Sequence, residues 1–213
     1  LKDFTSTLSQ LEARGLTGVF GTFIYADMKD ASTNIMYLQQ GAISLPDEAY
    51  YREEKYADIR TAFVEHVAKM FELAGVANGS DLAAKVMALE TTIASHHWDQ
   101  VKDRDATLTY NKMDRAQVKA LMSAFDWDLY LTAGEIPAVV LDSVIVQQPS
   151  FFEGLNSILA SFDVDAWKAW MKWHLISGAA PYLSDELVNE NFAFYGKTLS
   201  GTPELRERWK RAV

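Results

Sequence analysis

The chain of 213 residues contains no cysteine. This absence excludes a disulfide framework, a zinc site built on thiolates and a cysteine nucleophile. No apolar run approaches the roughly 20 residues of a membrane-spanning helix, and residues 1–15 lack the basic head and apolar stretch of a signal peptide. The chain carries no visible address, so its compartment stays open: an extracytoplasmic or secreted protein and a cytoplasmic protein both fit.

The zinc-peptidase motif His-Glu-x-x-His is also missing. In that motif the two histidines lie on one helical face and share the ion, while the glutamate beside them activates water. His66 is followed four residues later by Met70, not by a histidine. The neighbours His96 and His97 point about 100° apart on a helix, so only one of them can face a given site.

The best remaining pair of metal ligands is His96 with Asp99, followed by Asp103 a turn later. Two or three ligands of this kind do not define a metal site, and a helix-end histidine satisfied by neighbouring carboxylates is the expected case. We therefore predict no metal-binding residue. A metal-dependent hydrolase built on His96 and Asp99 is the least favoured function.

Signatures of other chemistries are absent too. No serine lies in Gly-x-Ser-x-Gly, and no glycine-rich loop has the spacing that cradles phosphates. Adjacent carboxylates occur as Asp103/Asp105, Asp126/Asp128 and Asp163/Asp165. In a chain of net charge -9 such pairs are expected on solvated faces, so we predict no catalytic and no cofactor-binding residue.

The charge balance bears on partners. With 29 acidic against 20 basic residues, the chain opposes the counterion release that drives non-specific binding to nucleic acids. We predict no nucleic-acid partner, and anionic membrane surfaces are poor candidates. Hydrophobic residues make up 49% of the chain, which predicts a folded globular protein.

The patterns that are present predict a mainly α fold, a multi-helix domain with one β-hairpin near the N-terminus. Two β-rich runs flank the turn-forming "ADMKDAST", which places the hairpin at about 17–40. The β-branched run 138–148 is predicted to be one extended strand, ended by Pro149. A single domain is predicted over residues 1–213. The predicted helices are about 46–51, 55–74, 80–97, 114–124, 151–161, 163–179, 184–199 and 202–213.

The spacing of apolar residues and the capping residues are the basis for predicting these helices. In 55–74 the apolar residues recur at three- and four-residue steps: Tyr56, Ile59, Phe63, Val67, Met70 and Ala74. Asp114 is the predicted N-cap of 114–124, with Gln117 completing a capping box. Pro46 is placed at a first helical position, where its missing N–H costs nothing. The polar run "QVKDRDATLT" is a predicted loop.

Three tryptophans step by three residues along helix 163–179: Trp167, Trp170 and Trp173. Such a set drifts around a helix, so part of it is predicted to pack inward and part to be exposed. Exposed tryptophans would suit a stand-alone helical protein- or peptide-binding module, which is the alternative function.

Several stretches are similar, in their order along the chain, to the N-terminal region of the neprilysin and endothelin-converting-enzyme family of zinc metallopeptidases. They are Gly41-x-x-x-Leu45-Pro46-Asp47-x-x-Tyr50-Tyr51, Leu89-Glu90, "YNKM" at 110–113, Phe125-Asp126-Trp127, Trp173 and the closing "FAFYGKTLSGTPELRERWKRAV". The absence of cysteine and the segment "HHWDQVKDRD" resemble bacterial members more than the disulfide-rich animal ectoenzymes.

The resemblance implies a substrate-gating, cavity-capping N-terminal domain of a zinc metalloendopeptidase. In that family zinc is held in the C-terminal domain, so the cofactor of the full-length parent is expected outside this chain, and this chain alone is predicted to be inactive. The implied partners are the C-terminal catalytic domain of the same protein and peptide substrates. No functional residue carries over, because the family's substrate-positioning arginines belong to a segment before Leu1. Pro46 and the Tyr50-Tyr51 pair would set how helix 55–74 departs from the hairpin. The chain is expected to be a fragment, since Val213 falls within a predicted helix.

Overall fold

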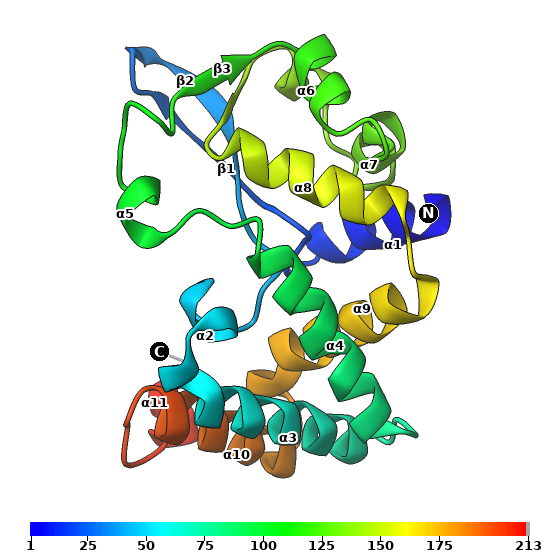
Figure 1. Ribbon diagram of the computed structural model, residues 1–213, viewed down its shortest axis with the longest axis vertical. Coiled ribbons are helices and arrows are strands. Elements are labelled where there is room, and N and C mark those ends of the chain that lie inside the picture. The colour runs from blue at the N-terminus through cyan, green and yellow to red at the C-terminus, as the bar shows by residue number, and fades with distance from the viewer. Residues whose placement is uncertain (212–213) are drawn as a thin grey trace. The chain divides into compact units, whose positions relative to one another are not determined.

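The computed structural model describes residues 1–211 (Figure 1). These residues form two compact units. Unit 1 comprises Leu1–Ala49 and Glu90–Val164. Unit 2 comprises Tyr50–Leu89 and the described residues from Asp165 onward. That both units make up a single domain stays a prediction. The predicted mainly α class is confirmed, and no helix in the described part of the chain has the length and apolar character to cross a membrane.

Unit 1 contains a four-stranded sheet in the order β1-β2-β4-β3. Its strands are β1 (Gly21–Asp27), β2 (Asp30–Gln39), β3 (Asn111–Met113) and β4 (Val144–Val146). β1 and β2 form the predicted antiparallel hairpin, with Tyr25 opposite Ile35. β4 runs parallel to β2, and β3 pairs antiparallel with β4, so segments far apart in the sequence complete the sheet.

The predicted strand over 138–148 is wrong in its extent. Ala138–Leu141 is a 3-10 helix, and only Val144–Val146 pairs as a strand. All three residues of β4 are buried, and β2 and β3 flank the strand on its two edges. Pro149 does not simply end this strand: it occupies the first turn of helix α8, where its missing N–H is tolerated.

Unit 1 also contains helices besides the end of the helix Gly79–Ala94. They are α1 (Lys2–Glu12), α5 (Gln100–Asp103), α6 (Arg115–Leu121), α7 (Trp127–Ala133) and α8 (Pro149–Ala160). The capping box predicted at Asp114 and Gln117 is present at the start of α6. α5 corrects the predicted loop, because the Asp99 side chain accepts from Val101 N and Lys102 N and so caps one helical turn.

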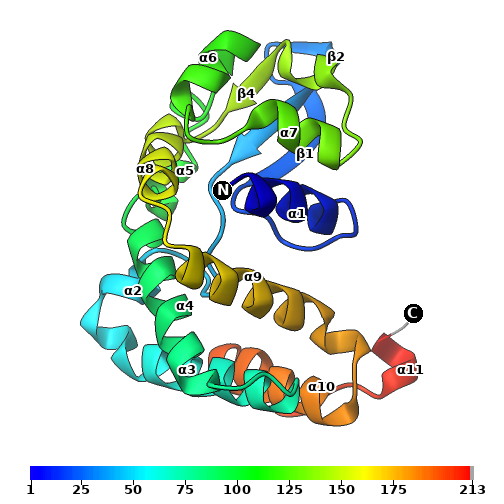
Figure 2. The same ribbon diagram turned by 90° about the vertical axis from the view of Figure 1, so that its right-hand side faces the viewer.

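An aromatic cluster forms the core beside these helices. The ring of Phe20 lies 5.6 Å from Phe125, 5.4 Å from Trp127 and 5.7 Å from Phe152, centroid to centroid. Rings of this size contribute most of the apolar area that a small core removes from water. Figure 2 shows α1 and α7 side by side, and Ser9 Oγ donates to the carbonyl of Tyr130 across that contact at 2.6 Å.

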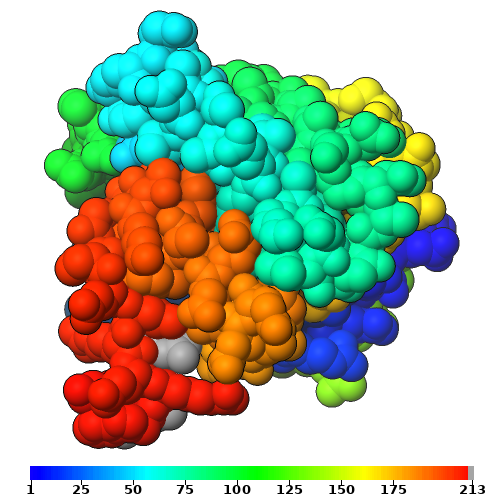
Figure 3. Space-filling view, turned by 90° about the horizontal axis from the view of Figure 1, so that it is seen from below, coloured from blue at the N-terminus to red at the C-terminus, as the bar shows by residue number. Residues whose placement is uncertain are grey.

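Unit 2 is helical. Its elements are α3 (Ala57–Leu73), the part of α4 (Gly79–Ala94) up to Leu89, α9 (Val164–Ala179) from Asp165, α10 (Asp185–Asn191), a π-helical segment (Phe192–Leu199) and α11 (Arg208–Arg211). α2 (Ala49–Arg52) begins at the last residue of unit 1. The α10 and π-helical segments, orange to red in Figure 3, lie beside α3.

The predicted stripe of α3 forms the core of this unit. Phe63, Val67 and Met70 are fully buried, and the Phe63 ring packs 5.8 Å from that of Trp173. The predicted helix 184–199 changes from α to π at Phe192, and α2 begins three residues after the predicted start at Pro46. In the predicted helix 202–213 the structure has a helix only at Arg208–Arg211, and residues 212 and 213 lie outside the described residues.

Candidate functional site

The 41–48 turn, Gly41 to Glu48, is anchored by a buried carboxylate. Ser44 donates twice to Glu90: its N–H to Oε2 at 2.9 Å and its Oγ to Oε1 at 2.7 Å. Glu90 is completely buried, and Leu45 is 2% exposed. Hydrogen bonds to a buried charged group each contribute about 1.5–3 kcal/mol. The turn is therefore held in one conformation by a residue of α4.

The chain around this turn is bonded to the segment that follows α4. Gln40 Nε2 donates to the carbonyl of Trp98 at 3.1 Å, and Trp98 N donates to Gln40 Oε1 at 2.8 Å. Gln100 Nε2 donates to Asp47 Oδ2 at 2.6 Å. His97 Nε2 lies 2.8 Å from the Gly41 carbonyl and must donate to it, because a carbonyl oxygen only accepts.

These two segments line a pocket of about 280 Å³. It is walled by Gln40, Pro46 and Asp47 from the first segment, by His97 and Asp103 from the second, and by Gln148. Gln148 Nε2 donates a short hydrogen bond to Asp103, and Gln148 Oε1 accepts from Gln40 N at 2.8 Å. The pocket is polar and acidic, and the bonds across it are structural cross-links between its walls.

The electrostatics of the pocket favour an uncharged histidine. Burial lowers the pKa of His97, against the smaller opposing effect of its hydrogen bond to the Gly41 carbonyl. The ring packs edge-on against Phe151, 4.8 Å between centroids. His97 therefore serves as a neutral hydrogen-bond donor that supports the turn.

The residues do not fit a metal ion. Asp99 caps α5, Asp103 accepts from Gln148, and His96 is turned toward α8, where a side-chain carbon added at Gly154 would lie 2.2 Å from His96 Cγ. Within residues 1–211, no group of three or more histidine and carboxylate side chains is placed to hold a metal. Among the described residues, His96, Asp99 and Asp103 are thus not gathered into a metal site.

The acidic pairs have structural partners. Asp126 accepts from Leu129 N at 3.0 Å as the N-cap of α7, and Asp128 accepts from Lys119 Nζ at 2.7 Å. Asp105 accepts from Thr107 N at 2.8 Å. In these pairs the carboxylates stabilise helix ends, turns and surface ion pairs.

The prediction that part of the tryptophan set is exposed is wrong. Trp167, Trp170 and Trp173 are 1%, 0% and 0% exposed, and the rings of Trp167 and Trp170 pack against each other at 5.6 Å. α9 is covered on enough of its circumference to bury residues three apart. The binding-module alternative loses the exposed tryptophans on which it depended.

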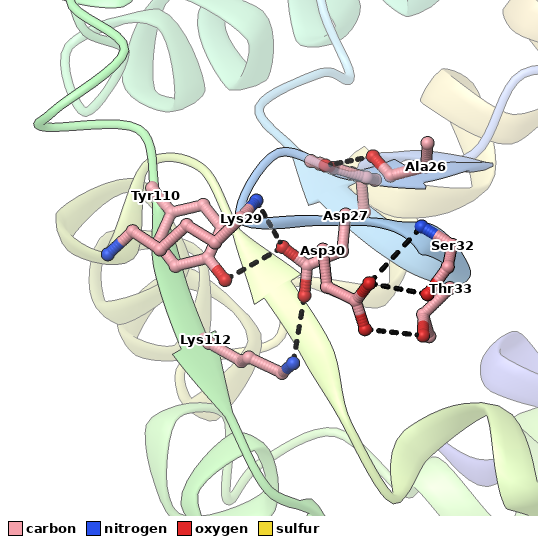
Figure 4. Close-up of polar contacts among 9 residues, drawn as sticks. Ala26, Asp27, Lys29, Asp30, Ser32, Thr33, Tyr110 and Lys112 are labelled. Atoms are coloured by element: carbon pink, nitrogen blue, oxygen red, sulfur yellow. Dashed lines mark hydrogen bonds and ion pairs between the residues drawn. The ribbon is translucent and has the colours of Figure 1, made fainter.

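A second polar cluster, the Asp27 cluster, ties the hairpin turn to β3 (Figure 4). Asp27 is 1% exposed and accepts from Lys29 N at 2.9 Å, from the Tyr110 hydroxyl at 2.8 Å and from Lys112 Nζ at 2.8 Å. The hydrogen bond from Lys112 is the largest cause that lowers the pKa of Asp27, to about 2. Tyr110 and Lys112 belong to the "YNKM" stretch, so its composition reflects this contact.

Sequence reasoning missed Asp27 and Glu90 as key residues. Asp27 is one of several acids in a turn and lies in no pattern. Glu90 belongs to the Leu89-Glu90 stretch of the family resemblance, but the sequence indicated its contact with Ser44 only by placing an acid within the apolar stretch of α4. Their partners lie 46 residues away for Glu90 and 85 for Asp27.

Comparison with known proteins shows which proteins this chain is similar to. The family model described as Peptidase family M13 matches residues 1–213. Human endothelin-converting enzyme 1 is 23% identical over 221 residues, and the neutral endopeptidase of Lactobacillus helveticus is 25% identical over 191. These matches cover 99% and 88% of this chain, but only 28% and 29% of those proteins.

Among solved structures, the zinc metalloprotease Zmp1 of Mycobacterium tuberculosis in complex with an inhibitor superposes with a TM-score of 0.94 at 38% identity. The match covers 99% of this chain and 32% of that one. PepO from Lactobacillus rhamnosis shares the fold, with a TM-score of 0.81 at 22% identity. The chain thus spans about a third of the length of these relatives.

Proposed function

Because this chain belongs to peptidase family M13, as the N-terminal domain of a neprilysin-like metallopeptidase, we propose that it is the substrate-gating, cavity-capping domain of a zinc metalloendopeptidase. The observation that carries the proposal is the full-length family match of a chain without His-Glu-x-x-His, which spans about a third of its relatives. Zinc and the hydrolytic residues belong to the remainder of the protein. The partners are that catalytic part and the peptides it cleaves.

The rigidity of the 41–48 turn supports a role in shape rather than in chemistry. Its polar groups bond to Glu90, His97 and Gln100, and none of these bonds arranges a nucleophile beside a base. A wall that limits the size of entering peptides must keep its shape without reacting with them. A turn that is cross-linked by hydrogen bonds to Glu90, His97 and Gln100 meets that requirement.

The gating role is tested by peptide length. In the full-length enzyme, Gln40→Ala removes two hydrogen bonds to Trp98 and Pro46→Ala frees the backbone of the turn, while Tyr51→Ala removes a buried side chain from α2. A loss of about 1 kcal/mol per hydrogen bond corresponds to roughly a fivefold change in kcat/KM if the bond supports the entrance. We expect this change for long peptides and a smaller one for short peptides.

The control is Lys69→Ala, which removes an exposed ion pair with Glu72 on α3. It should leave kcat/KM unchanged for both lengths, because exposed pairs contribute little. Equal losses of kcat/KM for long and short peptides in the Gln40, Pro46 and Tyr51 variants would refute gating and indicate a general loss of structure.

A further inference from the structure

β1 is an edge strand whose outer edge meets no other strand of residues 1–211. Three consecutive apolar residues on it are exposed: Phe23 by 39%, Ile24 by 65% and Tyr25 by 68%. Successive side chains of a strand point to opposite faces of the sheet, so β1 exposes apolar side chains on both faces. Met28, at the hairpin turn, is 52% exposed and extends this surface.

This edge lacks the usual protection against pairing with other chains. Natural edge strands carry lysine or proline, or bulge away from a partner. The exposed residues of "GTFIYAD" include neither, and the register shift lies beyond them, between Ala26 and Asp27. An unprotected apolar edge is an aggregation hazard unless something covers it.

The hairpin is also held in a defined position. The Asp27 cluster bonds its turn to β3 (Figure 4), and the Tyr37 hydroxyl donates to the Ala26 carbonyl at 2.8 Å. The Phe23 ring stacks on Tyr37, 4.9 Å between centroids. The exposed surface of β1 is therefore preformed, which lowers the ordering cost of docking.

We propose that the β1 surface, made of Phe23, Ile24, Tyr25 and Met28, is where the catalytic part of the same polypeptide packs onto this domain. The proposal rests on the proposed function, which supplies that catalytic part. This chain covers 32% of the Zmp1 chain, so about two thirds of that protein lies outside the matched region and is large enough to cover the β1 surface.

The form of the surface selects this occupant over a peptide substrate. An extended peptide that adds to a sheet edge satisfies the edge backbone and places its side chains beside those of the strand. It leaves much of the two faces of β1 in water. Covering apolar side chains on both faces requires a body that wraps the strand.

The test is photo-crosslinking in the full-length enzyme. p-Benzoylphenylalanine is placed at Ile24 and, in a second variant, at Tyr25; both side chains are exposed, so the fold of unit 1 tolerates the change. The matched control places the same probe at Val139, which is 66% exposed in the same unit. Peptide mapping by mass spectrometry then identifies the partner residues, with and without an added peptide substrate.

We expect the probes at 24 and 25 to react mainly within the chain, with residues that follow position 213, and at a higher yield than the probe at 139. Crosslinks to the added peptide or to a second copy of the protein, or a yield no higher than that of the control, would overturn the proposal. The peptide-length assay reads the gating role independently. Length discrimination without crosslinks at 24 and 25 would refute the docking surface alone.

Discussion

The buried carboxyl of Glu12, which is hydrogen-bonded to Tyr130, should make the stability of the protein depend on pH. Glu12 is the last residue of α1, and its Oε2 accepts a short hydrogen bond from the Tyr130 hydroxyl on α7. Its Oε1 is buried without a hydrogen-bond partner, against Gly18: a side-chain carbon added there would lie 1.5 Å from it. Burial raises the pKa of Glu12 from 4.5 to about 7, although the bond from Tyr130 opposes this.

The sign follows from proton linkage. The folded state binds the proton of Glu12 more tightly than the unfolded chain, so the stabilisation is complete below the unfolded pKa of 4.5 and is lost as the pH rises through about 7. The difference between the two pKa values, at about 1.4 kcal/mol per unit, amounts to about 3 kcal/mol. Other groups titrate in the same range, so a variant must isolate this one.

Glu12→Gln keeps an acceptor for Tyr130 and carries no charge at any pH. Relative to the parent protein, the free energy of unfolding of the variant should rise by about 3 kcal/mol between about pH 4.5 and about pH 8. Urea denaturation over this range measures the difference, and hydrogen exchange of residues 2–12 assigns it to α1. The control is Glu72→Gln, since the side chain of Glu72 is 70% exposed on α3.

A difference between variant and parent that does not change with pH would refute the reasoning. It would mean that Glu12 is ionised in the folded protein at neutral pH. An equal response in the Glu72→Gln control would show that the effect is not specific to the buried carboxyl.

Three further predictions concern other buried polar groups. Burial lowers the pKa of His66, whose Nδ1 donates to Glu190 at 2.8 Å, so the contribution of this histidine to stability should be lost as the pH falls below the unfolded pKa of 6.5. His66→Gln should remove this acid sensitivity, which hydrogen exchange of the α3 amides measures. An acid response in the variant equal to that of the parent protein would contradict the prediction. Glu90→Ala should lower the free energy of unfolding by about 3–6 kcal/mol, because Ser44 loses both bonds to a fully buried carboxylate. A urea titration beside Glu72→Ala measures this loss, and equal small losses in both variants would show that the 41–48 turn does not depend on Glu90. Asp27→Asn should speed hydrogen exchange in β1 and β2, since the ion pair with Lys112 is lost; unchanged exchange would mean that the hairpin pairing alone positions the turn.

Protonation of Glu12 and protonation of His66 change the stability of the protein in opposite directions. Protonation stabilises unit 1 at Glu12 and destabilises unit 2 at His66. Acidification from neutral pH should therefore protect α1 while it loosens α3. The two units are predicted to differ in the pH at which each is most stable.

The local elements follow from the sequence alone. The stripe of α3, the capping box at Asp114 and Gln117, and the hairpin between two β-rich runs each depend on interactions within a few residues. The missing His-Glu-x-x-His motif is likewise a property of the sequence. The family resemblance, which rests on short stretches in order, is confirmed by a match over residues 1–213.

Tertiary structure decided which polar residues matter. Glu90 and Ser44 are 46 residues apart, and Asp27 and Lys112 are 85 apart, so no periodicity or spacing relates them. The short strands β3 and β4 exist only because β2 gives β4 a partner and β4 gives β3 one. The burial of all three tryptophans of α9 depends on what packs around that helix. Helical periodicity and capping act over a few residues, whereas burial and charge pairing are set by segments that only folding brings together.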